Sequence, residues 1–130
     1  MELALLLAYA YLIGSAPTAY LLGRWVRGID IRRVGSGNVG GSNVWHHVGR
    51  GWVVPLGLFE VFGKGASPVL LGHYALGYPL PSWPLVGAGL VAVAAHQWPV
   101  WLRFWGGRGV AAALGALLAL SPPVLGAVVA

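Results

Sequence analysis

Two glycine-rich stretches carry the residues of this 130-residue sequence that could do chemistry. The first, Val34–Asn43, combines four glycines with two hydroxyls and two amides and has no carboxylate. The second, Arg103–Gly109, reads Arg-Phe-Trp-Gly-Gly-Arg-Gly. Glycines let a backbone approach a ligand closely and form a nest of N–H groups for an anion. Arg108 adds a planar, permanently charged fork that suits phosphate oxygens. The pattern predicts that the two stretches bind phosphate groups.

Other functions for the first stretch are weaker. Gly35, Gly37 and Gly40 match the dinucleotide fingerprint G-x-G-x-x-G, which requires a preceding strand and a βαβ unit. An apolar segment and a charged turn precede these glycines instead, and no Walker lysine follows them. We therefore reject the dinucleotide fingerprint. Tight helix connections that simply need glycine remain the alternative to a phosphate site.

Metal and covalent chemistry have little support in the sequence. His46 and His47 are adjacent, and neighbouring positions of a helix do not face the same ligand. Ser36 lies outside a G-x-S-x-G elbow and has no evident His/Asp pair to activate it. The absence of cysteine excludes thiolate metal sites. We therefore expect neither a metal site nor a covalent acyl-enzyme.

The elements that must position the two stretches are membrane helices. The composition is 58% hydrophobic and 8% charged, whereas ordinary soluble domains are about 25% charged. Stretches of about twenty apolar residues are long enough to span a bilayer. We expect one all-α domain over residues 1–130, a polytopic helical bundle with about four spans. These spans are Leu3–Leu22, Trp52–Leu71, Leu85–Trp101 and Val110–Ala130.

The charge distribution predicts the orientation of these spans. Arginines directly follow the first apolar segment, so the positive-inside rule places the N-terminus outside and the arginines in the cytoplasm. Four spans then bring both glycine-rich stretches to the cytoplasmic face, together with every basic residue except Lys64. No basic run is interleaved with aromatic residues, so we expect no nucleic-acid partner.

Three further residues lie within the predicted spans. Glu60 and Lys64 are spaced i,i+4 and share one helix face. Charges inside a span are costly and usually face the bundle interior. Both a self-neutralising structural ion pair and a functional site fit this spacing. His96, near the end of the third span, is either a hydrogen-bonded core residue or part of a site.

The motifs resemble those of a known family, the bacterial acyl-phosphate:glycerol-3-phosphate acyltransferases. Gly35–Asn43 resembles the family's first motif, G-S-G-N-x-G-A-T-N-x-x-R. His96–Pro99 with Phe104–Ala111 resembles the second, G-H-x-x-P-x-F-x-x-F-K-G-G-K-G-V-A-T. Phe59–Gly65 is similar to F-D-x-x-K-G with one extra residue. The resemblance extends over essentially the whole chain.

The resemblance implies a multi-pass protein of the bacterial inner membrane, with its motif loops in the cytoplasm. It implies acyl transfer from acyl phosphate to glycerol 3-phosphate, which forms lysophosphatidic acid for phospholipid synthesis without a metal or cofactor. The implied partners are these two substrates and membrane lipid. The implied catalytic residues are Ser36, His46 and Arg108. The implied substrate-binding residues are Gly35, Gly37, Asn38, Gly40, Asn43, Lys64, His96, Gly106, Gly107 and Gly109.

Several positions depart from the family's motifs. His46 stands at the arginine of the first motif, and Trp105 and Ala112 stand at a lysine and the threonine of the second. The family's third motif has no counterpart in these 130 residues, which predicts a truncated version of the fold or a shortened relative. A catalytically impaired homologue that binds phosphorylated lipid precursors or a partner is therefore the main alternative function. A small transporter subunit is a further alternative, supported by span count alone.

Overall fold

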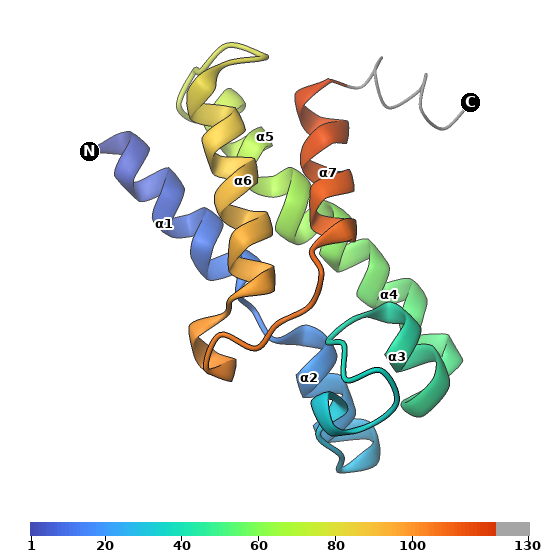
Figure 1. Cartoon of the computed structure of the whole chain (residues 1–130). Coiled ribbons are helices and arrows are strands. Elements are labelled where there is room, and N and C mark those ends of the chain that lie inside the picture. The colour runs from blue at the N-terminus through green and yellow to red at the C-terminus, as the bar shows by residue number, and fades with distance from the viewer. Residues whose placement is uncertain (122–130) are drawn as a thin grey trace.

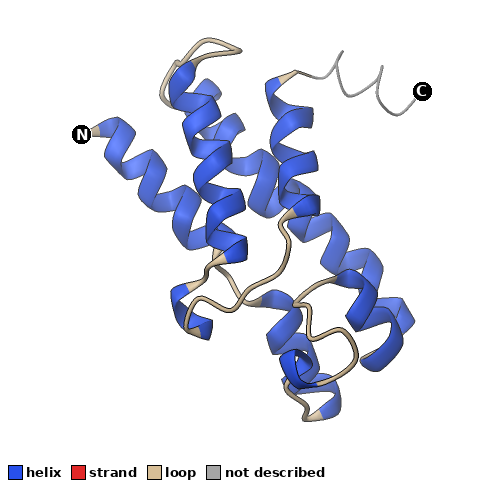
Figure 2. Ribbon diagram, viewed as in Figure 1, coloured by secondary structure: helices blue, strands red, loops and turns tan. Residues whose placement is uncertain are grey.

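The computed structural model describes residues 1–121, and all regular structure within that range is helical (Figures 1 and 2). Three helical segments are long and apolar enough to cross a membrane, namely Glu2–Arg27, Arg50–Tyr74 and Trp83–Leu102. The shortest has 20 residues, which at 1.5 Å per residue corresponds to about 30 Å, the thickness of a bilayer core. These segments confirm the predicted all-α, polytopic architecture. The predicted fourth span begins as α7 (Val110–Leu120), and its remainder, residues 122–130, lies outside the described residues.

The first segment, which contains the predicted span Leu3–Leu22, is broken into two helices. Helix α1 (Glu2–Gly14) ends before residues 15–17, and α2 (Thr18–Leu22) restarts the chain in a new direction. Pro17 causes the break, because it has no N–H to donate and disfavours helical geometry in the residue before it. Helix α2 then continues into a π-helical turn, η1 (Gly23–Arg27).

The second and third segments form the centre of the bundle (Figure 1). A π-helical turn interrupts the second segment at its middle, so that Glu60 and Lys64 lie in a wider turn than an α-helix provides. The third segment consists of one long helix and a short 3₁₀ turn. The elements of the second segment are η3 (Arg50–Trp52), α4 (Val53–Leu58), η4 (Phe59–Ala66) and α5 (Ser67–Tyr74), and those of the third are α6 (Trp83–Gln97) and η5 (Val100–Leu102).

Small residues let the spans pack backbone against backbone. A Cβ atom added at Gly14 would collide with the carbonyl oxygen of Ala92, and one added at Gly115 would collide with that of Val61. Van der Waals contact of this kind holds membrane helices together, since lipid removes the usual hydrophobic driving force between them. The buried core of this layer is made of Leu6, Ala10, Ala66, Val69, Leu85, Ala88, Ala92, Ala116 and Ala119.

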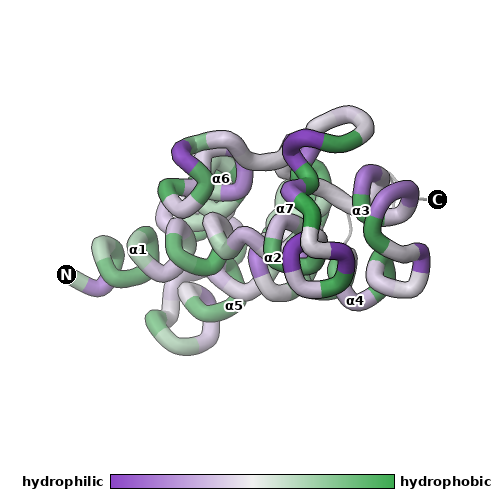
Figure 3. Tube along the Cα trace, turned by 90° about the horizontal axis from the view of Figure 1, so that it is seen from below, coloured by the Kyte–Doolittle hydropathy of each residue, from purple (hydrophilic) through white to green (hydrophobic). Residues whose placement is uncertain are grey.

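A second, smaller core lies at the end of the molecule that carries the two glycine-rich stretches, here called the polar end. Ala19, Ile31, Val39, Val44 and Leu102 are buried there, below the bundle in the view of Figure 1. This core carries η2 (Ile31–Arg33) and a short helix, α3 (Gly41–His47), which the sequence did not predict. Seen from this end in Figure 3, the hydrophilic stretches gather around the loops, α2 and α3, while α1 is mainly hydrophobic.

Candidate active site

A buried polar cluster joins three helices just inside the polar end. The Glu60 carboxylate accepts a hydrogen bond from Thr18 Oγ1 at 2.8 Å and one from Lys64 Nζ at 3.1 Å. Its other oxygen lies 3.0 Å from His96 Nδ1. Only 2% of the Lys64 side chain is exposed. Glu60 therefore links α2, η4 and α6, and each buried charge of the cluster is paired, as buried charges require.

The contacts indicate which nitrogen of His96 carries a proton. Lys64 Nζ also lies 3.3 Å from His96 Nδ1. One nitrogen cannot both donate to Glu60 and accept from Lys64, and the contact with the carboxylate is the shorter one. A proton on Nδ1 directed at Glu60 leaves Nε2 of a neutral imidazole as a hydrogen-bond acceptor. That atom faces the second glycine loop.

The second glycine loop (residues 103–109) packs directly on the end of α6. The N–H groups of Gly106 and Gly107 donate to the carbonyl oxygens of Gln97 at 3.0 Å and His96 at 3.1 Å. A Cβ atom at Gly107 would lie 2.5 Å from His96 Nε2 and 2.5 Å from the carbonyl oxygen of Val39. Glycine is therefore required at 107, because the imidazole and both glycine loops meet there.

The first glycine loop (residues 34–43) is held together by Asn43. Its buried amide nitrogen donates to the carbonyl oxygens of Ile31 at 2.9 Å, Val34 at 3.1 Å and Asn38 at 3.1 Å. Gly35 and Gly37 adopt left-handed conformations, with φ of 54° and 74°, which glycine adopts without steric cost. The amide of Asn43 thus shapes the loop from within, and the prediction that it also contacts substrate remains a prediction.

The structure separates the predicted site residues into three groups. Lys64, His96, Gly106 and Gly107 come together around the buried cluster. The three predicted catalytic residues, Ser36, His46 and Arg108, are exposed, and within residues 1–121 no hydrogen bond or ion pair joins their side chains to one another. The remaining predicted residues, Gly35, Gly37, Asn38, Gly40 and Gly109, shape the loop backbone, and Gly109 precedes α7 with φ of 79°.

A small cavity of about 10 Å³ adjoins the buried cluster, between Pro17, Leu102, Gly106 and the side chains of Glu60, Lys64 and His96. This volume holds about one water molecule and no larger ligand. Thr18 reaches the cluster only because the break at Pro17 redirects the chain. Sequence reasoning missed Thr18, and the one available signal was a hydroxyl directly after a proline inside an apolar segment.

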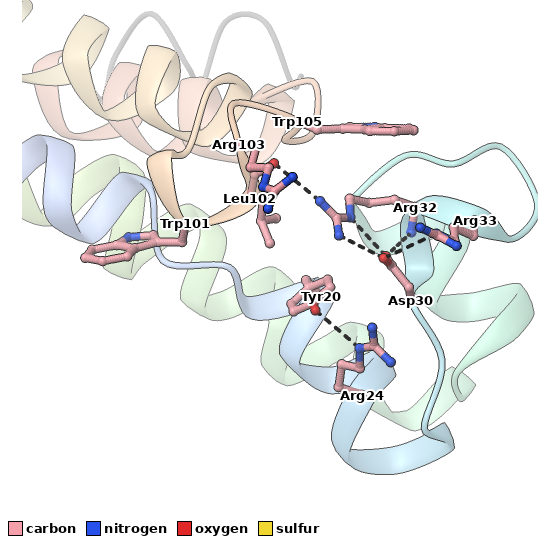
Figure 4. A pocket seen from close by; sticks show the side chains of 9 residues that line it. All are labelled: Tyr20, Arg24, Asp30, Arg32, Arg33, Trp101, Leu102, Arg103 and Trp105. Carbon is pink, nitrogen blue, oxygen red and sulfur yellow. Dashed lines mark hydrogen bonds and ion pairs between the residues drawn. The ribbon is translucent and has the colours of Figure 1, made fainter.

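A larger basic pocket of about 750 Å³ opens beside the loops (Figure 4). Arg32 occupies its centre and donates to both oxygens of Asp30, at 2.8 and 3.0 Å, and to the carbonyl oxygen of Leu102 at 3.3 Å. The hydrogen bonds from Arg32 hold the pKa of Asp30 below its ordinary value, and the same contact raises the pKa of Arg32. We did not single out this Asp-Ile-Arg-Arg stretch in the sequence and missed the pocket. The lining residues are Tyr20, Arg24, Asp30, Arg32, Arg33, Trp101, Leu102, Arg103 and Trp105.

These features define a polytopic α-helical membrane protein whose two glycine loops meet over a buried Glu–Lys–His cluster. The chain belongs to the glycerol-3-phosphate acyltransferase family, since the family model with that description matches residues 4–130. It is 51% identical over 120 residues to a glycerol-3-phosphate acyltransferase of Synechococcus sp. (strain CC9902), a match that covers 92% of this chain and 58% of the relative. It is 52% identical over 112 residues to glycerol-3-phosphate acyltransferase 5 of Dehalococcoides mccartyi (strain ATCC BAA-2266 / KCTC 15142 / 195), covering 86% and 46%.

Two solved structures share the fold. Both are crystal structures of PlsY (YgiH), an integral membrane glycerol 3-phosphate acyltransferase. The glycerol 3-phosphate form superposes with a TM-score of 0.86 at 38% identity, and the lysophosphatidic acid form with 0.83 at 36%. Each match covers 96% of this chain and 60% of the solved one. The chain spans about half the length of the curated relatives it matches.

Proposed function

We propose that the chain catalyses, or forms the catalytic half of a protein that catalyses, acyl transfer from acyl phosphate to glycerol 3-phosphate. The convergence of both glycine loops and the His96 imidazole at Gly107 carries this proposal. The family and the glycerol 3-phosphate and lysophosphatidic acid forms of the related structure support it. The donor is proposed from the motif resemblance alone.

In this reaction the glycerol 3-phosphate hydroxyl attacks the acyl phosphate carbonyl. The ester C–O bond forms, the acyl C–O bond to phosphate breaks, and inorganic phosphate leaves with the hydroxyl proton. Both substrates carry phosphate, so the two loops provide one anion-binding backbone for each. Arg108, exposed on the second loop, stabilises charge that develops on the leaving phosphate. Ser36 and Asn38 on the first loop orient the attacking hydroxyl.

We further propose that this face lies in the cytoplasm of a bacterium and that the protein resides in its inner membrane, with the N-terminus outside. The arginines at the end of the first segment and in both loops support this orientation under the positive-inside rule. Reporter fusions at the N-terminus and within residues 75–82 would test it, because both positions should report the external side.

The activity is tested with the purified chain in lipid nanodiscs, long-chain acyl phosphate and radiolabelled glycerol 3-phosphate. We expect labelled lysophosphatidic acid and an equal amount of released phosphate. Arg108→Ala should lower the rate by about 10²–10³-fold, as loss of one charge-stabilising donor typically does. Arg50→Ala, an exposed arginine stacked 5.2 Å from Trp45, is the control. Normal turnover in Arg108→Ala would remove the proposed role of that residue.

Binding without turnover is the second candidate function. His46 and Trp105 favour it, because they replace an arginine and a lysine of the family's motifs with residues of lower charge. Binding of glycerol 3-phosphate without formation of lysophosphatidic acid would support this function, provided that a full-length family member is active in the same nanodiscs. Restoring the motif residues with His46→Arg and Trp105→Lys should then restore turnover.

A further inference from the structure

We infer that the basic pocket is a second phosphate-binding site, which takes Arg103 and Trp105 from the second loop but none of the glycines of either loop. Its walls come from the end of the first membrane segment, the Asp30–Arg33 connector and the turn after α6 (Figure 4). None of Ser36, His46, Lys64, His96 and Arg108 lines it. Buried Leu102 borders both this pocket and the small cavity beside Glu60, so the two spaces are neighbours that share one wall.

The charge of the pocket is strongly positive. Four arginines line it against a single carboxylate, Asp30, which is one of only three carboxylates in the chain. Each of the three guanidinium nitrogens of Arg32 donates one hydrogen bond, two to Asp30 and one to the Leu102 carbonyl oxygen. Arg33 reaches Asp30 only at 3.9 Å, and its side chain is 84% exposed. Within residues 1–121 the Arg103 guanidinium has no hydrogen bond or ion pair.

These contacts assign two tasks to the arginines. The hydrogen bonds to Asp30 hold the Arg32 side chain in place at the centre of the pocket. Its guanidinium carbon also lies 5.0 Å from the ring centroid of Tyr20 and 5.7 Å from that of Trp105. Arg33 and Arg103 face the pocket from opposite segments with their donors available. Guanidinium forks that converge from two sides match the several charged oxygens of a phosphate group better than the single plane of a carboxylate.

The backbone around Arg103 is unusual. Arg103 and Phe104 are both left-handed, with φ of 52° and 65°, and they are the two non-glycine residues with positive φ in the described part of the chain. Such conformations are sparsely populated and cluster at ligand sites, where surrounding contacts hold them. Here hydrogen bonds from both residues to Val100 and Pro99 fix the turn, which directs Trp101, Arg103 and Trp105 at the same space.

The volume and position of the pocket fit a phosphate carried by a small molecule or by a lipid headgroup. About 750 Å³ lies within the range of sites for small ligands. Trp101 and Trp105 are 60% and 55% exposed at the polar end of the bundle, where amphipathic rings sit at headgroup level. Inorganic phosphate and a phosphate-bearing lipid present the same group to these arginines. Comparing the affinity of the pocket for the two therefore tells whether the ligand is a small phosphate or a lipid headgroup.

Binding is measured by calorimetry with the full chain in an uncharged detergent. The probes are inorganic phosphate, a short-chain phosphatidic acid and, as a zwitterionic comparison, a short-chain phosphatidylcholine. We expect saturable binding of at least one of the first two. The double variant Arg33→Gln/Arg103→Gln should weaken it by about tenfold or more, because two charge-assisted contacts are lost. Arg50→Gln, which lies outside the pocket, should change the affinity less than about twofold, as screened surface charges do.

The double variant Arg33→Lys/Arg103→Lys keeps the charge and removes the planar fork. It replaces Arg33→Gln/Arg103→Gln in the measurement if that variant does not fold. Intermediate affinity in the lysine variant supports a shaped site. If only the phosphatidic acid binds, the ligand is a lipid headgroup; if both bind equally, the ligand is the phosphate itself. The proposal would be overturned if no saturable binding were seen, or if the pocket variants and Arg50→Gln weakened the binding equally. Binding here does not require acyl transfer, so the proposed reaction can fail independently.

Discussion

His96 Nδ1 lies 3.0 Å from Glu60 Oε2, which ties the end of α6 to the π-helical turn in the middle of the second span. The same carboxylate binds Lys64 and Thr18, so one buried acid connects three membrane segments. The contact also sets the tautomer of His96 and turns its free nitrogen towards Gly107, where the two glycine loops meet. The Glu60–Lys64 pair is therefore both a structural ion pair and part of the candidate site, because it orients His96.

Removing one partner of this buried pair should destabilise the protein strongly. Lys64→Met leaves the Glu60 carboxylate buried without its ammonium partner, and we expect the free energy of unfolding to fall by about 3–5 kcal/mol. Equilibrium unfolding in mixed detergent micelles measures this loss. The double variant Glu60→Gln/Lys64→Met should lose less than the sum of the two single variants. Additive losses would show that the two residues do not interact.

Gly107 should tolerate no side chain. Gly107→Ala places a methyl group 2.5 Å from His96 Nε2 and from the Val39 carbonyl oxygen, so the loops must separate. We expect a loss of about 1–3 kcal/mol in the free energy of unfolding, as for other overpacked sites, and weaker binding of glycerol 3-phosphate. Gly57→Ala is the matched control, because its Cβ meets nothing within 4 Å and alanine favours the helix by up to about 1 kcal/mol. Equal effects of the two changes would contradict the close approach at Gly107.

The sequence was sufficient to predict three of the four expected spans and the proximity of the two loops. Hydropathy is a local property, so the ends of three apolar segments could be located within a few residues. Pro17 was visible in the sequence, but its consequence was not, because a proline in a membrane helix can be accommodated when neighbours satisfy the backbone. Here the chain breaks, and the break brings Thr18 to Glu60.

The basic pocket could not have been predicted from the sequence. Arg32 and Leu102 are far apart along the chain and meet through tertiary packing alone. The short helix α3 was missed for another reason, since Gly41, Ser42 and Asn43 favour loops by propensity. Burial of Val44 and Val48 in the lower core stabilises α3 despite those residues. The exposed positions of Ser36, His46 and Arg108 likewise depend on how the loops pack.

Asn43 should control the order of the first glycine loop. Asn43→Ala removes the donor to three backbone carbonyl oxygens, and we expect a loss of about 1–3 kcal/mol in the free energy of unfolding. Hydrogen exchange should accelerate across residues 34–43. Ser42→Ala, next to it on the exposed face of α3, should leave exchange unchanged. Unchanged protection in Asn43→Ala would mean that the glycines alone fix the loop.

Because of Asp30, the free energy of unfolding of the protein should fall as the pH becomes acidic. Hydrogen bonds from Arg32 hold the pKa of Asp30 below its ordinary value of 3.8 in the folded chain. The unfolded chain therefore takes up a proton on Asp30 first as the pH falls, so the stabilisation is complete above about pH 4 and disappears as the pH drops through the folded pKa.

The matching variant is Asp30→Asn, which keeps the shape and the side-chain oxygen that accepts from the Arg32 backbone N–H at the start of η2, and removes the charge. Because Arg32 loses a charged acceptor, we expect the variant to be about 1–3 kcal/mol less stable than the parent at pH 7. The difference should shrink steadily below pH 4, because the parent then loses the Asp30 charge that the variant never carries. The other two acidic residues, Glu2 and Glu60, are the same in both proteins. The arginines that surround Asp30 stay charged throughout this range, so no other group in the pocket opposes the trend. A difference that is constant from pH 7 to pH 2.5 would show that the Asp30–Arg32 contact contributes nothing as an ion pair.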